Sequence, residues 1–313
     1  MLKSLNIAIS NHCNFKCVMC NIWKNSDAQQ DYMTVADYQQ ALQTNAAYIQ
    51  YVEEVSITGG EPFLRADIIE LVETIINSLH KVKHLFINTN GSFRNETLEF
   101  VDKLSQKVDF LTVCVSIDGD MATHNQIRGR VSYDECVALI KDVNAFPKES
   151  VNAIISTTLV KEESALKVLF AMRDLATILK CGFTFRLADN SDSYYKNKKF
   201  KCQFSDKVLL EIKDFIEQHF SHDLFLSHLA KVLLGEPNDI MVDSSGQNLC
   251  RAGDVFNFIE ADGTIRPCIY STRELGNILD LVKLDAINDL GRFEPCPCCT
   301  ECTIYPMINF VNA

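Results

Sequence analysis

The sequence lacks the features of membrane, secreted and nucleic-acid-binding proteins. No apolar run approaches the roughly 20 residues that a membrane-spanning helix needs, and residues 1–10 form no signal peptide. The net charge of −11 over 313 residues gives no excess of positive charge to hold a phosphate backbone. We therefore expect a cytoplasmic protein with neither a membrane nor a nucleic-acid partner. One basic stretch departs from this balance and is predicted to be a solvated loop: Lys196, Lys198, Lys199 and Lys201.

Cysteine, by contrast, is abundant. The chain holds 13 cysteines, and in a secreted protein this number would indicate disulfides. Seven of the 13 fall in two tight clusters, and the sequence shows no signal peptide. Metal ligation in a reducing compartment therefore explains the cysteines better than a disulfide framework. Outside these clusters, Cys114, Cys136 and Cys181 are predicted to be small buried apolar residues.

The apolar pattern predicts alternating strands and helices up to residue 187. Strands are expected over residues 5–9, 54–57, 84–88, 110–117, 153–159 and 183–187. Helices are expected over residues 34–48, 68–79, 95–104, 133–144 and 164–179. Six such repeats predict a parallel sheet with right-handed crossovers. The fold class is therefore α/β, a partial (β/α)6 TIM-like barrel.

The rest of the chain is predicted to form two further regions. Residues 188–248 are expected to be a linker or lid with two helices, 205–219 and 223–234, that pack on the barrel. The last region is rich in cysteine and begins with a β-hairpin of strands 256–260 and 264–267. The predicted domains are thus 1–187, 188–248 and 249–313.

Three cysteines directly follow the first predicted strand. Cys13, Cys17 and Cys20 have the spacing C-x3-C-x2-C. Three thiolates on one short loop reach three irons of a 4Fe–4S cube and leave the fourth iron open to another ligand. A structural zinc site is the alternative, and His12 is the only further ligand nearby in the sequence.

Polar motifs also follow the next three strands. Gly59-Gly60-Glu61-Pro62 comes after the second strand, Asn88 and Asn90 close the third, and Ser116 lies at the end of the fourth. Ligands gather at the C-terminal ends of parallel strands, so these motifs predict one site at that rim. Glycines 59 and 60 would let the backbone approach a ligand closely. For the asparagines, turn chemistry after a strand is the alternative.

Together these motifs resemble the radical S-adenosylmethionine (radical SAM) superfamily over residues 5–187. In that family the open iron chelates SAM, and a Gly-Gly-Glu-Pro run follows one strand after the cysteines. The resemblance to its sulfatase-maturase branch implies that Ser116 and Arg128 bind SAM, with the arginine gripping a carboxylate. Met19 replaces the usual aromatic residue before the third cysteine. The SAM contacts implied are Met19, Gly59, Gly60, Glu61, Asn88, Asn90, Ser116, Arg128 and Leu187.

The C-terminal cysteines resemble the SPASM/twitch extension of radical SAM enzymes, which carries auxiliary 4Fe–4S clusters. Cys250 and Cys268 bracket the predicted hairpin, and four more cysteines follow in the tail. Six cysteines fit the twitch form with one cluster. The resemblance implies the ligands Cys250, Cys268, Cys299 and Cys302, with Cys296 as a possible replacement. A structural zinc is the alternative.

This resemblance implies an enzyme in which an electron from a flavodoxin- or ferredoxin-type donor cleaves SAM. The 5′-deoxyadenosyl radical so formed removes a hydrogen atom from the substrate. No N-terminal peptide-recognition domain precedes the first strand, so a small polar substrate such as a sugar or aminocyclitol is expected. A ribosomal peptide or protein maturase, acting on a side chain or Cα, is the alternative, and a non-catalytic zinc-binding module is an alternative of another class.

Two outcomes of the reaction stay open. In dehydrogenation, the substrate radical gives an electron to the auxiliary cluster. In epimerisation, a thiol returns a hydrogen atom from the opposite face, and three cysteines are candidates: Cys202, Cys296 and Cys298. The general base is expected among four residues that the sequence does not rank: Asp189, Asp192, His228 and Glu260.

Overall fold

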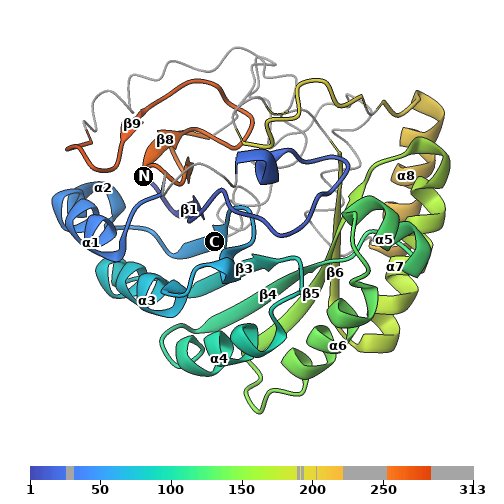
Figure 1. Ribbon diagram of the computed structural model, residues 1–313, viewed down its shortest axis with the longest axis horizontal. Helices are drawn as coiled ribbons and strands as arrows, with labels where there is room; N and C mark the ends of the chain where they lie inside the picture. The colour runs from blue at the N-terminus through green and yellow to red at the C-terminus, as the bar shows by residue number, and fades with distance from the viewer. Residues whose placement is uncertain (26–31, 189–190, 192–193, 202, 221–251, 283–313) are drawn as a thin grey trace.

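The computed structural model describes residues 1–25, 32–188, 191, 194–201, 203–220 and 252–282. Within these residues one sheet has the strand order β6-β5-β4-β3-β2-β1-β7-β8-β9 (Figure 1). The first six strands are parallel to their neighbours, as the sequence predicts. Their bounds are β1 Ser4–Ala8, β2 Glu54–Thr58, β3 His84–Thr89, β4 Phe110–Ser116, β5 Val151–Leu159 and β6 Gly182–Leu187. The predicted α/β partial barrel is therefore confirmed.

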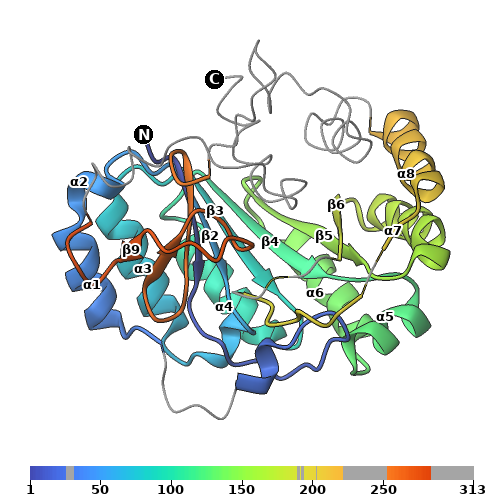
Figure 2. The same ribbon diagram turned by 90° about the horizontal axis from the view of Figure 1, so that it is seen from above.

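The helices lie on the outer side of this sheet (Figure 2). Two of them, α3 and α6, have the predicted bounds, and the predicted helix 34–48 breaks at Asn45 into α1 and α2. Helix α5 and the short 3-10 turns were not predicted. The helices are α1 Val35–Thr44, α2 Ala46–Ile49, α3 Ile68–Leu79, α4 Arg94–Leu104, α5 Met121–Arg128, α6 Tyr133–Asn144, α7 Ala165–Leu179 and α8 Asp206–His219. The 3-10 turns are η1 Ile22–Asn25, η2 Pro62–Leu64 and η3 Glu162–Ser164.

The strands alternate between an apolar outer face and a polar inner face. Val55 and Ile57 of β2 and Leu85 of β3 have no exposed surface and belong to the core beneath the helices. Ser56 of β2 and Asn88 of β3 instead line cavities inside the curved sheet. Because side chains alternate along a strand, this pattern places the main core between sheet and helices and leaves an interior lined by both polar and apolar side chains.

The C-terminal hairpin continues the barrel sheet. Strand β7, Phe256–Ile259, pairs in parallel with β1, while β8, Thr264–Arg266, and β9, Gly276–Asn277, follow antiparallel. The predicted hairpin is thus present, and its turn is made by Gly263 at a φ of +87°. Its pairing with β1 was not predicted. The domain boundaries remain a prediction, and the predicted helix 223–234 lies outside the described residues.

Side-chain hydrogen bonds hold this hairpin to the N-terminal helices. The Asn45 amide, 2% exposed, donates to the carbonyl oxygens of Ile278 and Asp280 at 2.8 and 3.0 Å. The Asn257 amide of β7 donates to the Tyr48 hydroxyl at 2.6 Å. Among the helices of the described ranges, none is long and apolar enough to cross a membrane.

Candidate active site

A pocket of about 240 Å³ lies at the C-terminal rim of the sheet. Cys13, Cys17 and Cys20, on the loop after β1, all line it. Seven of the nine predicted SAM contacts line the same pocket: Met19, Gly59, Gly60, Asn88, Asn90, Ser116 and Arg128. The fold therefore brings the motifs that follow four different strands together around the three cysteines, as the parallel-sheet argument requires.

The three thiols are largely buried, and burial acts on their ionisation. It raises the pKa of Cys13 to about 12 and that of Cys20 to about 11. Burial also raises the pKa of Cys17, although the nearby Arg128 guanidinium opposes this effect. Because the thiolate is the metal ligand, such a site needs a strongly charged metal centre to displace these protons.

Gly59 and Gly60 lie where the loop after β2 packs against the cysteine loop. The Gly60 and Glu61 amides donate to the Ser10 and His12 carbonyl oxygens, both at 2.7 Å. A Cβ on Gly60 would lie 1.9 Å from the His12 oxygen, and one on Gly59 would lie 2.4 Å from the Ser10 oxygen. These glycines are therefore required first by backbone packing, which the sequence argument about a ligand did not foresee.

Glu61 is fully buried and does not line the pocket. Its carboxylate accepts hydrogen bonds from the Thr89 hydroxyl at 2.9 Å and the Asn90 amide at 2.7 Å. Burial raises the pKa of this carboxyl to about 7. Glu61 thus ties the β2 loop to the end of β3, which is a structural role in addition to the predicted cofactor contact.

Asn90 carries this connection on to the cysteine loop. Its side-chain amide donates to the Asn14 side-chain oxygen at 2.8 Å, and the Asn14 amide donates to the Ser92 hydroxyl at 2.9 Å. Asn88, by contrast, is held within the sheet by the Ser56 hydroxyl and the Ile57 carbonyl, both at 3.1 Å. Both asparagines therefore have structural partners as well as a place in the pocket.

A buried ion pair occupies the side of the pocket formed by α5. Arg128 Nε lies 2.6 Å from Asp118 Oδ2, and Arg128 Nη1 lies 3.9 Å from Cys17 Sγ. Asp118 Oδ1 in turn accepts from the Thr158 amide at 2.8 Å. Helix α5 begins at the Asp120 cap, whose side chain accepts from the Thr123 amide. The guanidinium is thus fixed between a carboxylate and a cysteine sulfur.

A second cavity, of about 710 Å³, lies inside the curved sheet. It shares four lining residues with the rim pocket: Asn6, Asn88, Ser156 and Arg186. Its wall combines polar groups with aromatic rings such as Phe86 and Phe256. The two cavities therefore adjoin along these shared side chains.

The model of the radical SAM superfamily matches residues 7–164. The chain belongs to the radical SAM superfamily. Sporulation killing factor maturation protein SkfB of Bacillus subtilis (strain 168) is 24% identical over 294 residues, which are 92% of this chain and 64% of that protein. Mycofactocin maturase MftC of Mycolicibacterium smegmatis is 28% identical over 275 residues, covering 85% of this chain and 65% of that protein.

This chain therefore spans slightly less than two thirds of the length of both relatives. Among solved structures, native anSMEcpe with bound AdoMet and Cp18Cys peptide superimposes with a TM-score of 0.63. The sequences are 19% identical, and the match covers 98% of this chain and 88% of that chain. At this identity the likeness supports the radical SAM fold.

The donor set fits the cluster of a radical SAM protein. Across the part of the chain that the structure describes, no three His, Cys, Asp or Glu side chains converge on a single metal ion. A 4Fe–4S cube takes one cysteine per iron and so suits thiols that line one pocket without meeting at a point. The three cysteines and the adjoining glycines would hold the cluster and SAM, which together supply radical chemistry.

Several radical SAM pocket residues were not predicted. Arg186 and Tyr195 line the pocket, with the guanidinium 4.9 Å from the centre of the Tyr195 ring and in contact with its hydroxyl. The Tyr194 hydroxyl donates to the Gly59 carbonyl at 2.8 Å, and Asn197 donates to the Met19 carbonyl at 2.8 Å. The alternation of β6 would have placed Arg186 inside the barrel. Tyr194 and Tyr195 lie in a segment without apolar periodicity, so nothing in the sequence indicated that they line the pocket.

Other predicted residues lie apart from this pocket. Leu187 ends β6 and does not line it, and neither does Glu260, whose carboxylate pairs with Arg266 at 2.6 Å. Cys268 is buried in a cluster with Tyr194 and Tyr270. The remaining predicted residues lie outside the described ranges: Asp189, Asp192, Cys202, His228, Cys250, Cys296, Cys298, Cys299 and Cys302.

Proposed function

We propose that this chain cleaves SAM reductively at a 4Fe–4S cluster on Cys13, Cys17 and Cys20 and removes a hydrogen atom from a peptide substrate. The observation that carries the proposal is the rim pocket, in which these cysteines face the Gly59–Gly60 backbone and Arg128. When bound, the cluster and SAM supply a 5′-deoxyadenosyl radical. The protein positions the target carbon and excludes water.

Each part of the pocket has a role in this proposal. In this proposal the Gly59–Gly60 backbone accepts the amino group of SAM, and Ser116 and Arg128 bind SAM with the guanidinium on its carboxylate; all four residues line the rim pocket. Asp118 restrains the guanidinium through Nε, at 2.6 Å, while Nη1 lies 3.9 Å from Cys17 Sγ. Glu61, Asn90 and Asn14 keep the two loops in register.

The interior cavity is the proposed substrate chamber. A barrel of this kind normally fills its interior with packed apolar side chains. Here the interior is hollow, with a volume of about 710 Å³ next to the rim pocket, and its wall mixes polar side chains with aromatic and other apolar ones. Its aromatic and polar wall is typical of sites that bind organic ligands. A side chain entering this chamber would meet the radical at the shared boundary.

A peptide substrate is better supported than the small polar molecule expected from the sequence. SkfB is named for the maturation of sporulation killing factor, MftC is named a mycofactocin maturase, and the anSMEcpe structure holds a peptide. We therefore adopt the maturase alternative as the proposal. An auxiliary cluster on Cys250, Cys268, Cys299 and Cys302 and a flavodoxin- or ferredoxin-type donor belong to it as proposals.

The test begins with iron and sulfide content and EPR spectra of anaerobically reconstituted protein. By the four-iron count of a cube, we expect about eight irons per chain in the wild type and about four in a Cys13/Cys17/Cys20→Ala variant. The variant should form no 5′-deoxyadenosine with dithionite and SAM. Cys181→Ala changes a cysteine in the wall of the interior cavity and away from the rim pocket; it is the matched control and should keep both the iron and the substrate-free cleavage of SAM.

The same assay distinguishes the substrate classes. Deoxyadenosine formation is measured with a pool of synthetic peptides and with a pool of sugars and aminocyclitols. Stimulation by the peptide pool supports the proposal. Stimulation by the second pool alone restores the small-molecule hypothesis, and an iron-free wild type that never cleaves SAM contradicts the whole proposal.

A further inference from the structure

Exposed lysines and arginines gather beside the rim site of an acidic protein. Three segments that meet there, residues 10–25, 127–133 and 194–201, together contain eight lysines and arginines and no aspartate or glutamate. The whole chain has a net charge of −11. A local field of opposite sign to the rest of the surface is typical of electrostatic recognition.

Backbone and side-chain hydrogen bonds join the three segments. The Val18 amide donates to the Ile127 carbonyl at 2.9 Å, which joins the cysteine loop to α5. The Asn21 amide donates to the Tyr195 carbonyl and its side chain donates to the Lys196 carbonyl, both at 2.9 Å. These bonds make the three segments one continuous surface over the cysteines.

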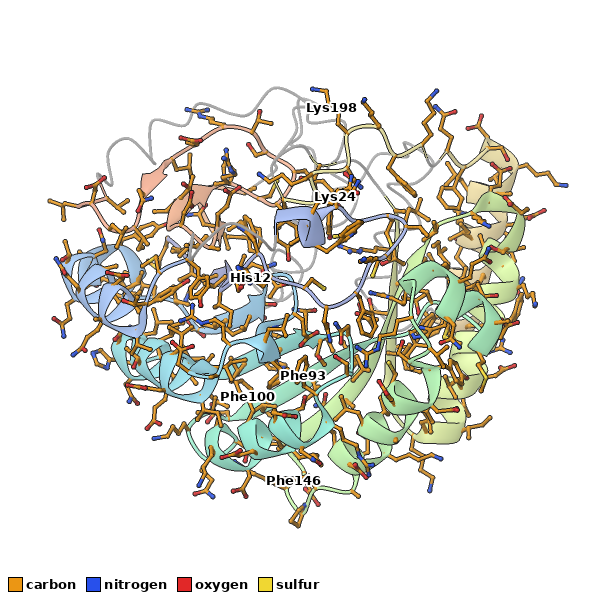
Figure 3. All side chains as sticks on the ribbon, viewed as in Figure 1. His12, Lys24, Phe93, Phe100, Phe146 and Lys198 are labelled. Atoms are coloured by element: carbon orange, nitrogen blue, oxygen red, sulfur yellow. The ribbon has the colours of Figure 1, made fainter. Side chains whose placement is uncertain are left out.

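The exposed cations on this surface surround an aromatic and apolar centre. We define the basic face as Lys16, Lys24, Arg130, Lys196 and Lys198, all of them exposed. Figure 3 shows Lys24 and Lys198 toward the same edge of the molecule. The ammonium groups of Lys16 and Lys24 lie 5.4 and 5.3 Å from the centre of the Trp23 ring. Val18, between two of the cysteines, is 50% exposed.

Trp23 connects the basic face to a predicted cluster ligand. Its indole N–H donates to the Cys20 carbonyl at 2.9 Å, and the ring also lines the rim pocket. A protein seated on the basic face would therefore bring its own redox centre close to the three cysteines. The lysines at 196–201 lie in an exposed loop, as the sequence predicts, and this loop directly follows Tyr194 and Tyr195, which line the rim pocket.

We propose that the basic face is the docking surface for an acidic one-electron carrier protein of the flavodoxin or ferredoxin type. This inference rests on the proposed function, because that reaction needs one electron from outside the chain. One electron leaves the reduced carrier and enters the cluster on Cys13, Cys17 and Cys20. The carrier is oxidised by one electron, the cluster is reduced by one, and no proton or bond is exchanged at this step.

The test compares a protein reductant with a small one. Lys16, Lys24 and Lys196 are changed to Glu together, and cluster reduction is followed anaerobically by stopped-flow absorbance with reduced flavodoxin and with dithionite. The matched control changes Lys81, Lys103 and Lys141 to Glu, which alters the net charge equally at exposed positions away from the rim. Iron content is measured for every variant, so that rates refer to equal amounts of cluster.

With flavodoxin, we expect the second-order rate constant to fall at least tenfold in the basic-face variant and to stay within twofold in the control. The wild-type rate should also fall as salt rises, because salt screens exposed charges. Reduction by dithionite should be the same in all three proteins. Dithionite-driven SAM cleavage by the wild type verifies the proposed function separately.

An unchanged flavodoxin rate in the basic-face variant, while dithionite still reduces the cluster and SAM is cleaved, would overturn the docking proposal alone. If that variant instead loses its stimulation by acidic members of the peptide pool, the face binds substrate and the donor assignment is also overturned. Failure of the wild type to cleave SAM with dithionite would overturn the proposed function, and the docking proposal with it.

Discussion

At the scale of single residues, the site is built on polar groups that are buried and paired. His124 is one of them, with no exposed surface. Its Nδ1 accepts from the Asp118 amide at 3.2 Å, and its Nε2 shares a hydrogen with the Ser132 hydroxyl at 2.9 Å. Burial lowers the pKa of this imidazole to about 4, and Arg128 acts in the same direction. A neutral His124 thus holds the loop that presents Asp118 to Arg128.

This shift predicts a pH dependence of stability. The unfolded chain takes up a proton on this imidazole below about pH 6.5, whereas the folded chain does so only near pH 4. The free energy of unfolding should therefore decrease as pH falls from about 6.5 to about 4. His124→Asn should reduce this slope in urea unfolding measured across that range. The exposed His80→Asn change should keep the wild-type slope, and equal slopes in all three proteins would contradict the prediction.

The site residues that could be predicted from the sequence are those that stand close together along the chain. Cys13, Cys17 and Cys20 stand in one loop, and the glycines at 59 and 60 form a motif, so both could be placed at the rim from the strand pattern alone. The sequence prediction missed Arg186 and Tyr195, because their contact depends on how an aperiodic segment folds back across β6. It also missed that Glu61 acts between two loops, since tertiary partners have no sequence signature.

At the scale of elements, the two loops after β1 and β2 behave as one unit. The short hydrogen bonds from Gly60 and Glu61 join them backbone to backbone. The loop after β3 is added through Glu61 and Asn14, and α5 is added through the Val18 amide. Rigid support of this kind fixes the positions of the cysteines that the chemistry needs.

Gly60→Ala should break this unit. Its Cβ would lie 1.9 Å from the His12 carbonyl oxygen, and backbone atoms cannot give way as a flexible side chain does. We expect a loss of about 3 kcal/mol in the free energy of unfolding, the upper end for overpacking, together with loss of most of the iron on reconstitution. Denaturant melts and iron assays measure the two effects.

Gly276→Ala is the control for Gly60→Ala. Gly276 has a φ of +138° and no atom within 4 Å of an added Cβ, so the change introduces backbone strain far from the cysteines. It should cost about 1–3 kcal/mol and leave the iron content unchanged. Equal iron loss in both variants would show that the close loop packing is not what holds the cysteines.

Helices and strands could be predicted where apolar residues recur along the sequence with a clear helical or strand period. Helices α3 and α6 have regular apolar faces and clear ends, and their bounds matched. Helix α5 was missed because its eight residues are mostly polar, with only His124, Ile127 and Arg128 buried. The parallel pairing of β7 with β1 could not be predicted, because no local pattern links strands at opposite ends of the described chain.

At the scale of the whole molecule, that pairing makes the C-terminal hairpin part of the barrel. The sheet continues from β1 into β7, and Asn45 fastens the segment after β9 to the junction of α1 and α2. The Asn45 side-chain oxygen also accepts from the Val282 amide at 2.7 Å. One buried side chain therefore connects the N-terminal helices to the last described residues.

Asn45→Ala should loosen this connection. It leaves the Ile278 carbonyl and the Val282 amide without their partner, and each such group costs about 1–3 kcal/mol. We expect a destabilisation of about 3 kcal/mol and faster amide hydrogen exchange over residues 276–282. Exchange in α6 should remain at the wild-type rate under native conditions. Unchanged exchange in the hairpin would show that sheet pairing alone holds it.

The place of β1 in the sheet also has a consequence for biosynthesis. Residue 4 pairs with residue 256, so β1 receives its second neighbour in the sheet only after the roughly 250 residues between them have been made. At roughly 5–20 residues per second, that interval lasts on the order of 10–50 seconds. Throughout it, β1 has one open edge, and open strand edges recruit other chains. Slow translation or premature termination should therefore expose this protein to aggregation through the open edge of β1.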